Sequence, residues 1–378
     1  MLASACALAQ RREPVLESRA LESTEMIADD LADLLETLVN IPSQTGHEAR
    51  IAEWVHDRLS AAGHGETLRS GHSLIWRGPR RDRPLVVLAG HLDTVPGDGV
   101  PATRDGDRLV GLGSSDMKAG DAVMLALIEH LAPERLRFDL TCVFYDAEEG
   151  PLENSGLTRV LREMPWLTDA RLAVLLEPTS LKAEMGCVGS LNAEVTVRGK
   201  RAHSARPWLG VNAVGRAAPW LAEVTQFPVT ATQLHGVEYR ETLQITTLNA
   251  GVAKNVVPDA LVANLNYRFP PDRDLAQAEA RLRSLVPDDF ELQVVDRAPP
   301  GRVALEVPEV REFVDRFGLE VAGKQGWTDV AQFSAAGVPA FNYGPGIPEQ
   351  AHQEGEYCPL GNLEPAFQTL ARFLSEDP

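Results

Sequence analysis

Cysteine is scarce in this chain, and no two cysteines form a C-x-x-C pair. The 378 residues contain only four cysteines, at positions 6, 142, 187 and 358. This scarcity excludes a disulfide-rich secreted scaffold and the usual cysteine-based zinc motifs. We therefore interpret the cysteines as structural thiols of a reduced protein and expect a cytoplasmic location.

Basic residues are also in deficit. Lysine and arginine number 36 against 54 aspartates and glutamates, which gives a formal net charge of −18. Nucleic-acid binding needs a basic surface, so we expect no nucleic-acid partner, although a local positive site for a small anion is compatible with this composition. No apolar run reaches the roughly 20 residues of a membrane helix, so we expect no membrane partner. Residues 1–24 lack the basic start of a signal peptide, and we interpret them as a poorly ordered extension.

What the chain does contain is an alternation of buried strands and helices. Short runs rich in valine and leucine at 84–90, 140–145 and 170–176 predict strands, and residues 116–132 predict a helix between the first two. Buried strands separated by helices are typical of an α/β domain, in which helices cover both faces of a mostly parallel sheet.

This pattern changes near residue 189 and resumes after residue 298. Between these points the sequence predicts the order β-α-β-β-α-β of a ferredoxin-like α+β domain. The predicted strands span 190–200, 241–251, 260–270 and 290–299, and the predicted helices span 210–227 and 274–286. A single core seldom exceeds roughly 250–300 residues. We therefore predict a larger domain of residues 25–188 and 299–378, with a smaller domain of residues 189–298 inserted into it.

Acidic and imidazole side chains follow three of the predicted strands, at the point where each strand ends. These side chains are His91 and Asp93, then Glu148 and Glu149, then Glu177. The carboxyl ends of strands in an open α/β sheet share one edge, so we expect the three groups to lie together. Asp116 starts the intervening predicted helix and can reach the same edge.

Each group alone has a simpler interpretation. A histidine and an aspartate after a strand often form a capping pair, two adjacent glutamates are usually a solvated surface, and an aspartate before a helix is usually an N-cap. A pair of strand-end carboxylates also allows a metal-free acid and base. Together, however, these groups carry too much negative charge to be left unpaired, and one or two dications would relieve the repulsion. Histidine and carboxylate ligands without cysteine suit Zn²⁺, Mn²⁺ or Co²⁺.

Seven short segments then resemble one known family in order and spacing. They are GHLDTVP, DMKAG, EEG, EPT, RAHSARP, NVVPD and the AH of EQAHQEG. From about residue 30 to the C-terminus, the chain resembles the M20 family of dinuclear zinc peptidases and deacylases. The resemblance implies a zinc-peptidase-like catalytic domain, an inserted lid and dimerisation domain, and a homodimer.

The resemblance also implies a role for each matching residue. His91 and Glu177 would hold one Zn²⁺, Glu149 and His352 the other, and Asp116 would bridge the two, with Co²⁺ or Mn²⁺ as possible substitutes. The resemblance implies catalytic roles for the other three matching positions, Asp93, Glu148 and His203. Asp93 would orient the His91 ring, and Glu148 would be the general base. His203 would reach across the dimer to stabilise the oxyanion, whereas by its own sequence context it is an ordinary loop histidine.

The substrate is inferred from two longer segments, 186–214 and 326–346. They are most similar to the succinyl-diaminopimelate desuccinylases of actinobacterial type, which implies release of succinate from N-succinyl-LL-diaminopimelate. Alignment with family positions implies substrate contacts at Ser190, Arg206, Asn255, Arg268 and Thr328. Arg268 suits a bidentate grip on a carboxylate, although any one of these arginines can instead be a surface ion pair. Cys187 and Val188 stand where many relatives outside this type have an arginine.

Three other functions stay open at this point. One is hydrolysis of another small N-acyl amino acid or dipeptide, such as N-acetylornithine, by the same kind of site. A second is a noncatalytic binding or assembly role, which the retention of Glu148 beside all five ligands disfavours. The third is amide formation, because the same groups serve both directions of the reaction.

Overall fold

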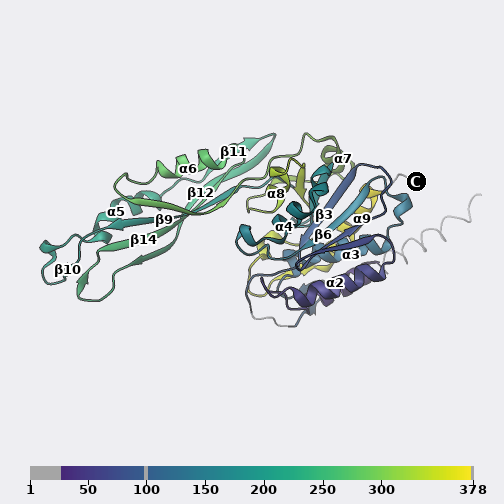
Figure 1. The fold of residues 1–378 in the computed structure, drawn as a ribbon, viewed down its shortest axis with the longest axis horizontal. Coiled ribbons are helices and arrows are strands. Elements are labelled where there is room, and N and C mark those ends of the chain that lie inside the picture. Colours follow the sequence, from purple (N-terminus) through teal and green to yellow (C-terminus); the bar gives the residue numbers. More distant parts are fainter. Residues whose placement is uncertain (1–26, 98–100, 376–378) are drawn as a thin grey trace, which may run out of the picture. The chain divides into compact units, whose positions relative to one another are not determined.

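The computed structural model describes residues 27–97 and 101–375 (Figure 1). The chain divides into two compact units, the first comprising Met1–Lys182 and Tyr343–Pro378 and the second Ala183–Asn342. The inserted domain predicted at residues 189–298 falls within the second unit, and its boundaries stay a prediction. The extension predicted at residues 1–24 lies outside the described residues.

Five strands of the first unit are neighbours in the order β1-β2-β6-β3-β7. Among them β3 (Leu85–His91) lies between β6 (Asp139–Tyr145) and β7 (Leu172–Leu175) and pairs in parallel with both. These three strands match the predicted ones and consist almost wholly of buried residues. The sequence did not predict β2 (Ser73–Arg77), which pairs antiparallel with β6, or β1 (Glu66–Ser70), which pairs antiparallel with β2.

The first unit also contains several helices. Residues 27–39 are helical, and α2 (Ala49–Ala61) follows them. Helix α3 (Ala119–His130) is buried along nearly its whole length and packs on β3 and on α9 (Leu363–Leu374). The sequence predicted a helix from residue 116, but Ser114–Lys118 form a π-type turn in which Asp116 has non-helical dihedral angles. The acidic side chain therefore stands on a turn, ahead of the helix.

The remaining elements of the first unit are short. Helix α4 spans Gly156–Glu163, and a small antiparallel sheet in the order β18-β5-β4 comprises Tyr357–Pro359, Arg108–Val110 and Thr103–Asp105. Among the described residues of the whole chain, no helix combines the length and the apolar character needed to cross a bilayer.

The second unit contains a five-stranded antiparallel sheet in the order β11-β12-β14-β9-β15. Its strands span Thr230–Leu234, Val237–Ala250, Ala260–Phe269, Gly189–Arg198 and Glu291–Ala298. Helices α5 (Ala213–Val224) and α6 (Leu275–Arg283) lie on the same side of this sheet, where Trp220 and Leu282 join the apolar core (Figure 1). Without β11, an edge strand that the sequence did not predict, this is the predicted ferredoxin-like order.

Outside this sheet, β8 (Ala183–Met185) pairs in parallel with β16 (Val321–Gly323) and antiparallel with β17 (Ala340–Asn342). Helices α7 and α8 span Pro308–Phe317 and Val330–Ala335. Two residues each, Ala202–His203 and Val256–Val257, pair as β10 and β13.

Candidate metal centre

His91 is the last residue of strand β3 and lies at the edge of the sheet, where the His91 side chain is only 1% exposed. The ring atom Nδ1 lies 3.0 Å from the backbone oxygen of Asp93, and Nε2 lies 3.2 Å from Oδ1 of Asp116. If Nδ1 donates to that carbonyl, Nε2 is left as the atom that can bind a cation. The Asp93 carboxylate is farther from Nδ1, at 3.6 Å.

The Asp93 carboxylate instead accepts hydrogen bonds from the turn that follows β6. Its Oδ1 accepts a hydrogen bond from the backbone N–H of Glu148 at 3.0 Å, and its Oδ2 accepts one from the N–H of Glu149 at 3.1 Å. The Thr45 hydroxyl, which the sequence did not point to, donates to the same Oδ2 at 2.9 Å. One fully buried carboxylate thereby ties the end of β3 to the two glutamates.

Asp116 faces two imidazoles with its two oxygens. Oδ1 lies 3.2 Å from Nε2 of His91, and Oδ2 lies 3.7 Å from Nε2 of His352. The same His352 nitrogen lies 3.0 Å and 2.9 Å from the two oxygens of Glu149. A carboxylate set between two imidazoles in this way has the geometry of a bridge between two cations.

The possible ligand atoms form three overlapping groups, each within 4.8 Å. The groups are His91, Glu148 and Glu149; His91, Asp116 and Glu177; and Asp116, Glu149 and His352. The structure thus brings together all five residues predicted as metal ligands and adds Glu148 beside them.

The electrostatics of the cluster favour cations. Burial lowers the pKa of His91, but the hydrogen bond to Asp116 and the nearby carboxylates raise it well above its ordinary value. The hydrogen bond to Glu149 likewise raises the pKa of His352. In both cases the carboxylates stabilise positive charge at the imidazole, and a metal cation can supply that charge in place of a proton. Nitrogen and oxygen donors without a thiolate fit Zn²⁺, Mn²⁺ or Co²⁺.

Two buried residues that the sequence did not assign to the site are Lys118, which belongs to the turn around Asp116, and Glu356, which contacts that turn. Lys118 donates from Nζ to the backbone oxygens of Leu38 and Ile41, at 3.0 Å and 2.9 Å, and burial lowers its pKa to about 8. Glu356 accepts hydrogen bonds from backbone N–H groups of the same turn. No local sequence signal marks either residue, because their partners are distant in the chain.

Six further predicted residues lie in the second unit, at three places. His203, Arg206 and Asn255 are exposed and share one loop region, where the Arg206 N–H donates to the His203 carbonyl at 2.8 Å and the Ser204 N–H to the Asn255 carbonyl at 2.9 Å. Ser190 and Arg268 are opposite partners on β9 and β14. Thr328, which is buried, donates from its hydroxyl to Oδ1 of Asn342 at 3.1 Å.

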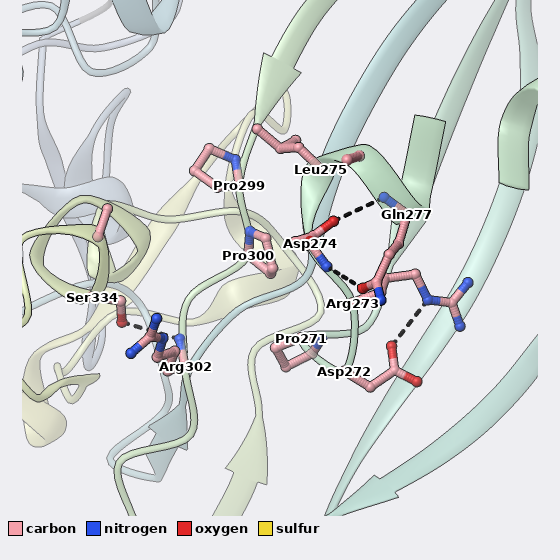
Figure 2. Close-up of a pocket in the computed structure, with 12 residues that line it drawn as sticks. Pro271, Asp272, Arg273, Asp274, Leu275, Gln277, Pro299, Pro300, Arg302 and Ser334 are labelled. Carbon is pink, nitrogen blue, oxygen red and sulfur yellow. Dashed lines mark hydrogen bonds and ion pairs between the residues drawn. The ribbon is translucent and has the colours of Figure 1, made fainter. Parts of the chain in front are cut away.

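A separate pocket of about 600 Å³ in the second unit has none of the predicted site residues in its lining. Figure 2 shows hydrogen bonds within the lining: the side chains of Asp274 and Gln277 each accept the backbone N–H of the other residue, and Arg273 donates to the Asp272 carboxylate. The pocket therefore offers no cluster of groups comparable with the one around Asp116.

Comparison of the sequence with models of known protein families identifies the family of this chain. The model of Peptidase family M20/M25/M40 matches residues 87–376. The chain belongs to this family. The M20/M25/M40 match extends from β3 to the end of α9 and includes all five predicted ligands and Glu148.

Three relatives illustrate the likeness. The putative succinyl-diaminopimelate desuccinylase DapE of Mycobacterium tuberculosis is 41% identical over 348 residues, which cover 91% of this chain and 98% of that protein. The succinyl-diaminopimelate desuccinylase of Corynebacterium glutamicum is 37% identical over 370 residues, which cover 96% and 100%. The fold matches the YXEP protein of Bacillus subtilis, a dinuclear metal-binding peptidase of the M20 family, with a TM-score of 0.69, 16% identity and coverage of 93% and 98%.

Proposed function

We propose that this chain is a dinuclear zinc amide hydrolase that removes succinate from N-succinyl-LL-diaminopimelate. The observation that carries the reaction type is the Asp116 carboxylate set between His91 and His352, with Glu148 beside them. The substrate is proposed because two relatives of that name are 41% and 37% identical over more than nine tenths of this chain.

The ligand set follows from the three groups of donor atoms. His91 and Glu177 would hold one cation, Glu149 and His352 would hold the other, and Asp116 would bind both. When bound, two such cations lower the pKa of a water molecule and polarise the amide carbonyl.

Glu148 would move the proton in this reaction. Its backbone is fixed by Oδ1 of Asp93, and that of Glu149 by Oδ2, so one carboxylate orients the general base and a ligand together. Glu148 takes a proton from water as the new C–O bond forms. It then returns that proton to the amide nitrogen as the C–N bond breaks, which yields succinate and LL-diaminopimelate.

Arg268 is the proposed clamp for a substrate carboxylate. Its Nε donates to Oδ1 of Asn266 at 3.1 Å, which orients the guanidinium, and Ser190 stands opposite it on the neighbouring strand. Burial lowers the pKa of Arg268, but a guanidinium stays charged and binds carboxylates bidentately. We propose Arg206, Asn255 and Thr328 as the further substrate contacts.

A homodimer through the second unit is part of the proposal, with His203 acting in the active site of the partner subunit. Exposed apolar side chains near β10 support such an interface, among them Trp208 at 75% and Val252 at 70% exposure. The free, buried thiols of Cys142, Cys187 and Cys358 support a reducing compartment such as the cytoplasm.

The test is release of succinate from N-succinyl-LL-diaminopimelate by the zinc-loaded protein. We expect turnover that depends on zinc and falls about 10²–10⁴-fold in a Glu148→Gln variant that still binds two zinc ions. N-acetylornithine serves as the control substrate and should react much more slowly.

Two outcomes would contradict parts of this proposal. Zinc-loaded protein that hydrolyses N-acetylornithine but releases no succinate would reject the substrate and keep the hydrolase. Protein that binds no zinc and hydrolyses neither substrate would favour the noncatalytic alternative.

A further inference from the structure

Glu356 lies four residues after the proposed ligand His352 and is 2% exposed. Its Oε1 accepts hydrogen bonds from the backbone N–H groups of Ser115 at 2.7 Å and Asp116 at 2.9 Å. Its Oε2 accepts one from the N–H of Gly113 at 2.8 Å. Three donors of a single turn therefore converge on one buried carboxylate.

The backbone of the turn is shaped for an anion. Gly113 has a φ of 80°, in the left-handed region that favours glycine, and the N–H groups of Ser115 and Asp116 point at the same carboxylate as its own. Concavities lined by successive N–H groups bind anions in many proteins. Here the anion is a side chain of the same protein, contributed from about 240 residues farther along the chain.

Further hydrogen bonds join the same two segments. The N–H of Gly111 donates to the backbone oxygen of Glu356 at 2.8 Å, and the Ser115 hydroxyl donates to the backbone oxygen of Tyr357 at 2.7 Å. The N–H of Ile347 donates to that hydroxyl at 3.0 Å, and β18 pairs with β5 just beyond. The segment with His352 and the turn with Asp116 are thereby held in one fixed register.

A buried carboxylate is a costly way to join two segments, because its charge must be desolvated. Three backbone N–H donors offset part of that cost, and they belong to the turn that contains a proposed ligand. Asp116 gives its N–H to Glu356 while its side chain faces His91 and His352.

We propose that Glu356 is a positioning residue that sets Asp116 in register with His352 and so determines the affinity of the dinuclear site. The inference rests on the proposed metal site. Glu356 would not touch the metals or the substrate. It would act by fixing the direction of the Asp116 carboxylate, because a small rotation of the turn moves both oxygens away from their imidazoles.

The experiment compares Glu356→Gln with Glu354→Gln, a matched control two residues away at an exposed position. The zinc affinity of each full-length variant is measured by competition with a chromogenic chelator, and the visible absorption of the Co²⁺-loaded protein reports ligand geometry. In Glu356→Gln the amide NH₂ must oppose a backbone N–H, so we expect at least one zinc to bind roughly 10–100-fold more weakly and the Co²⁺ spectrum to change. The control should keep wild-type affinity and spectrum.

Wild-type zinc affinity and an unchanged Co²⁺ spectrum in Glu356→Gln would overturn the proposal. Thermal unfolding of the metal-free variants shows whether the fold survives, and Glu356→Asp, which keeps the charge but shortens its reach, decides the matter if Glu356→Gln does not fold. With Glu356→Asp we expect weaker zinc binding and a changed spectrum, and wild-type values would again overturn the proposal. Failure of the wild-type protein to bind metal would instead reject the proposed metal site itself.

Discussion

At the scale of single residues, Asp93 makes two different contacts, one with its main chain and one with its side chain. The sequence placed it beside His91 and implied that it orients the imidazole, yet the nearer acceptor for Nδ1 is its backbone oxygen, at 3.0 Å against 3.6 Å for the carboxylate. The carboxylate is occupied by the Thr45 hydroxyl and by the N–H groups of both glutamates. One residue thus holds the ring with its main chain and the next loop with its side chain.

Lys118→Met tests a buried cation that stabilises the fold. The change removes an ammonium group that donates to the backbone oxygens of Leu38 and Ile41, so both buried acceptors lose this donor. Removal of a buried charge offsets part of that loss, so we expect a net destabilisation of about 2 kcal/mol. Urea unfolding of the metal-free protein measures it.

The control for this prediction is Lys200→Met. Lys200 is exposed, so its replacement should change the free energy of unfolding by less than about 0.5 kcal/mol. Equal stability of the Lys118→Met variant and the wild-type protein would show that the two hydrogen bonds only balance the cost of burying the charge.

At the scale of elements, Gly120 fixes how closely α3 approaches the strand that leads to Glu177. A Cβ atom at this position would lie 2.3 Å from the backbone oxygen of Leu176 and 2.7 Å from its Cβ, so the helix or the strand end would have to move. We expect Gly120→Ala to lower the free energy of unfolding by about 1–3 kcal/mol and to weaken zinc binding, because Glu177 directly follows Leu176. Denaturant unfolding and chelator competition measure the two effects.

Gly215→Ala is the matched control, since a Cβ there meets only Cβ of Asn212, at 3.9 Å. Alanine in helix α5 should be neutral or stabilise by up to about 1 kcal/mol. If Gly120→Ala changed the stability as little as Gly215→Ala, the close packing of α3 on the strand end would not explain the glycine at position 120.

The sequence predicted those elements whose signal is local. The Val- and Leu-rich runs identified β3, β6 and β7, and because parallel strands share their carboxyl edge, His91, Asp116 and Glu177 could be expected to meet. The short polar β11 and the largely exposed β1 were missed because their pairing partners, and not their own pattern, define them. Strand β2 was missed although its Leu-Ile-Trp run is buried, because that run is only three residues long. Glu356 was missed because only the folded backbone brings Gly113, Ser115 and Asp116 around it.

At the scale of the whole molecule, the predicted residues fall in both compact units. The metal ligands and Glu148 belong to the first unit, whereas His203 and Arg268 belong to the second. His203 is exposed, and its Nδ1 accepts the N–H of Ala205 at 3.0 Å, which leaves Nε2 directed away from that turn. An exposed histidine beside exposed apolar side chains is suited to act on a second copy of the chain.

A hybrid dimer of one Glu148→Gln subunit and one His203→Ala subunit tests this arrangement. If His203 serves the partner's site, one of the two sites in the hybrid lacks both groups, and the other contains an intact Glu148 and an intact His203. Each homodimeric variant should be nearly inactive, whereas hybrids isolated through two different affinity tags should recover about half of the wild-type turnover. If His203 acted within its own subunit, every site in the hybrid would lack one group, and turnover would stay at the low level of the parent variants.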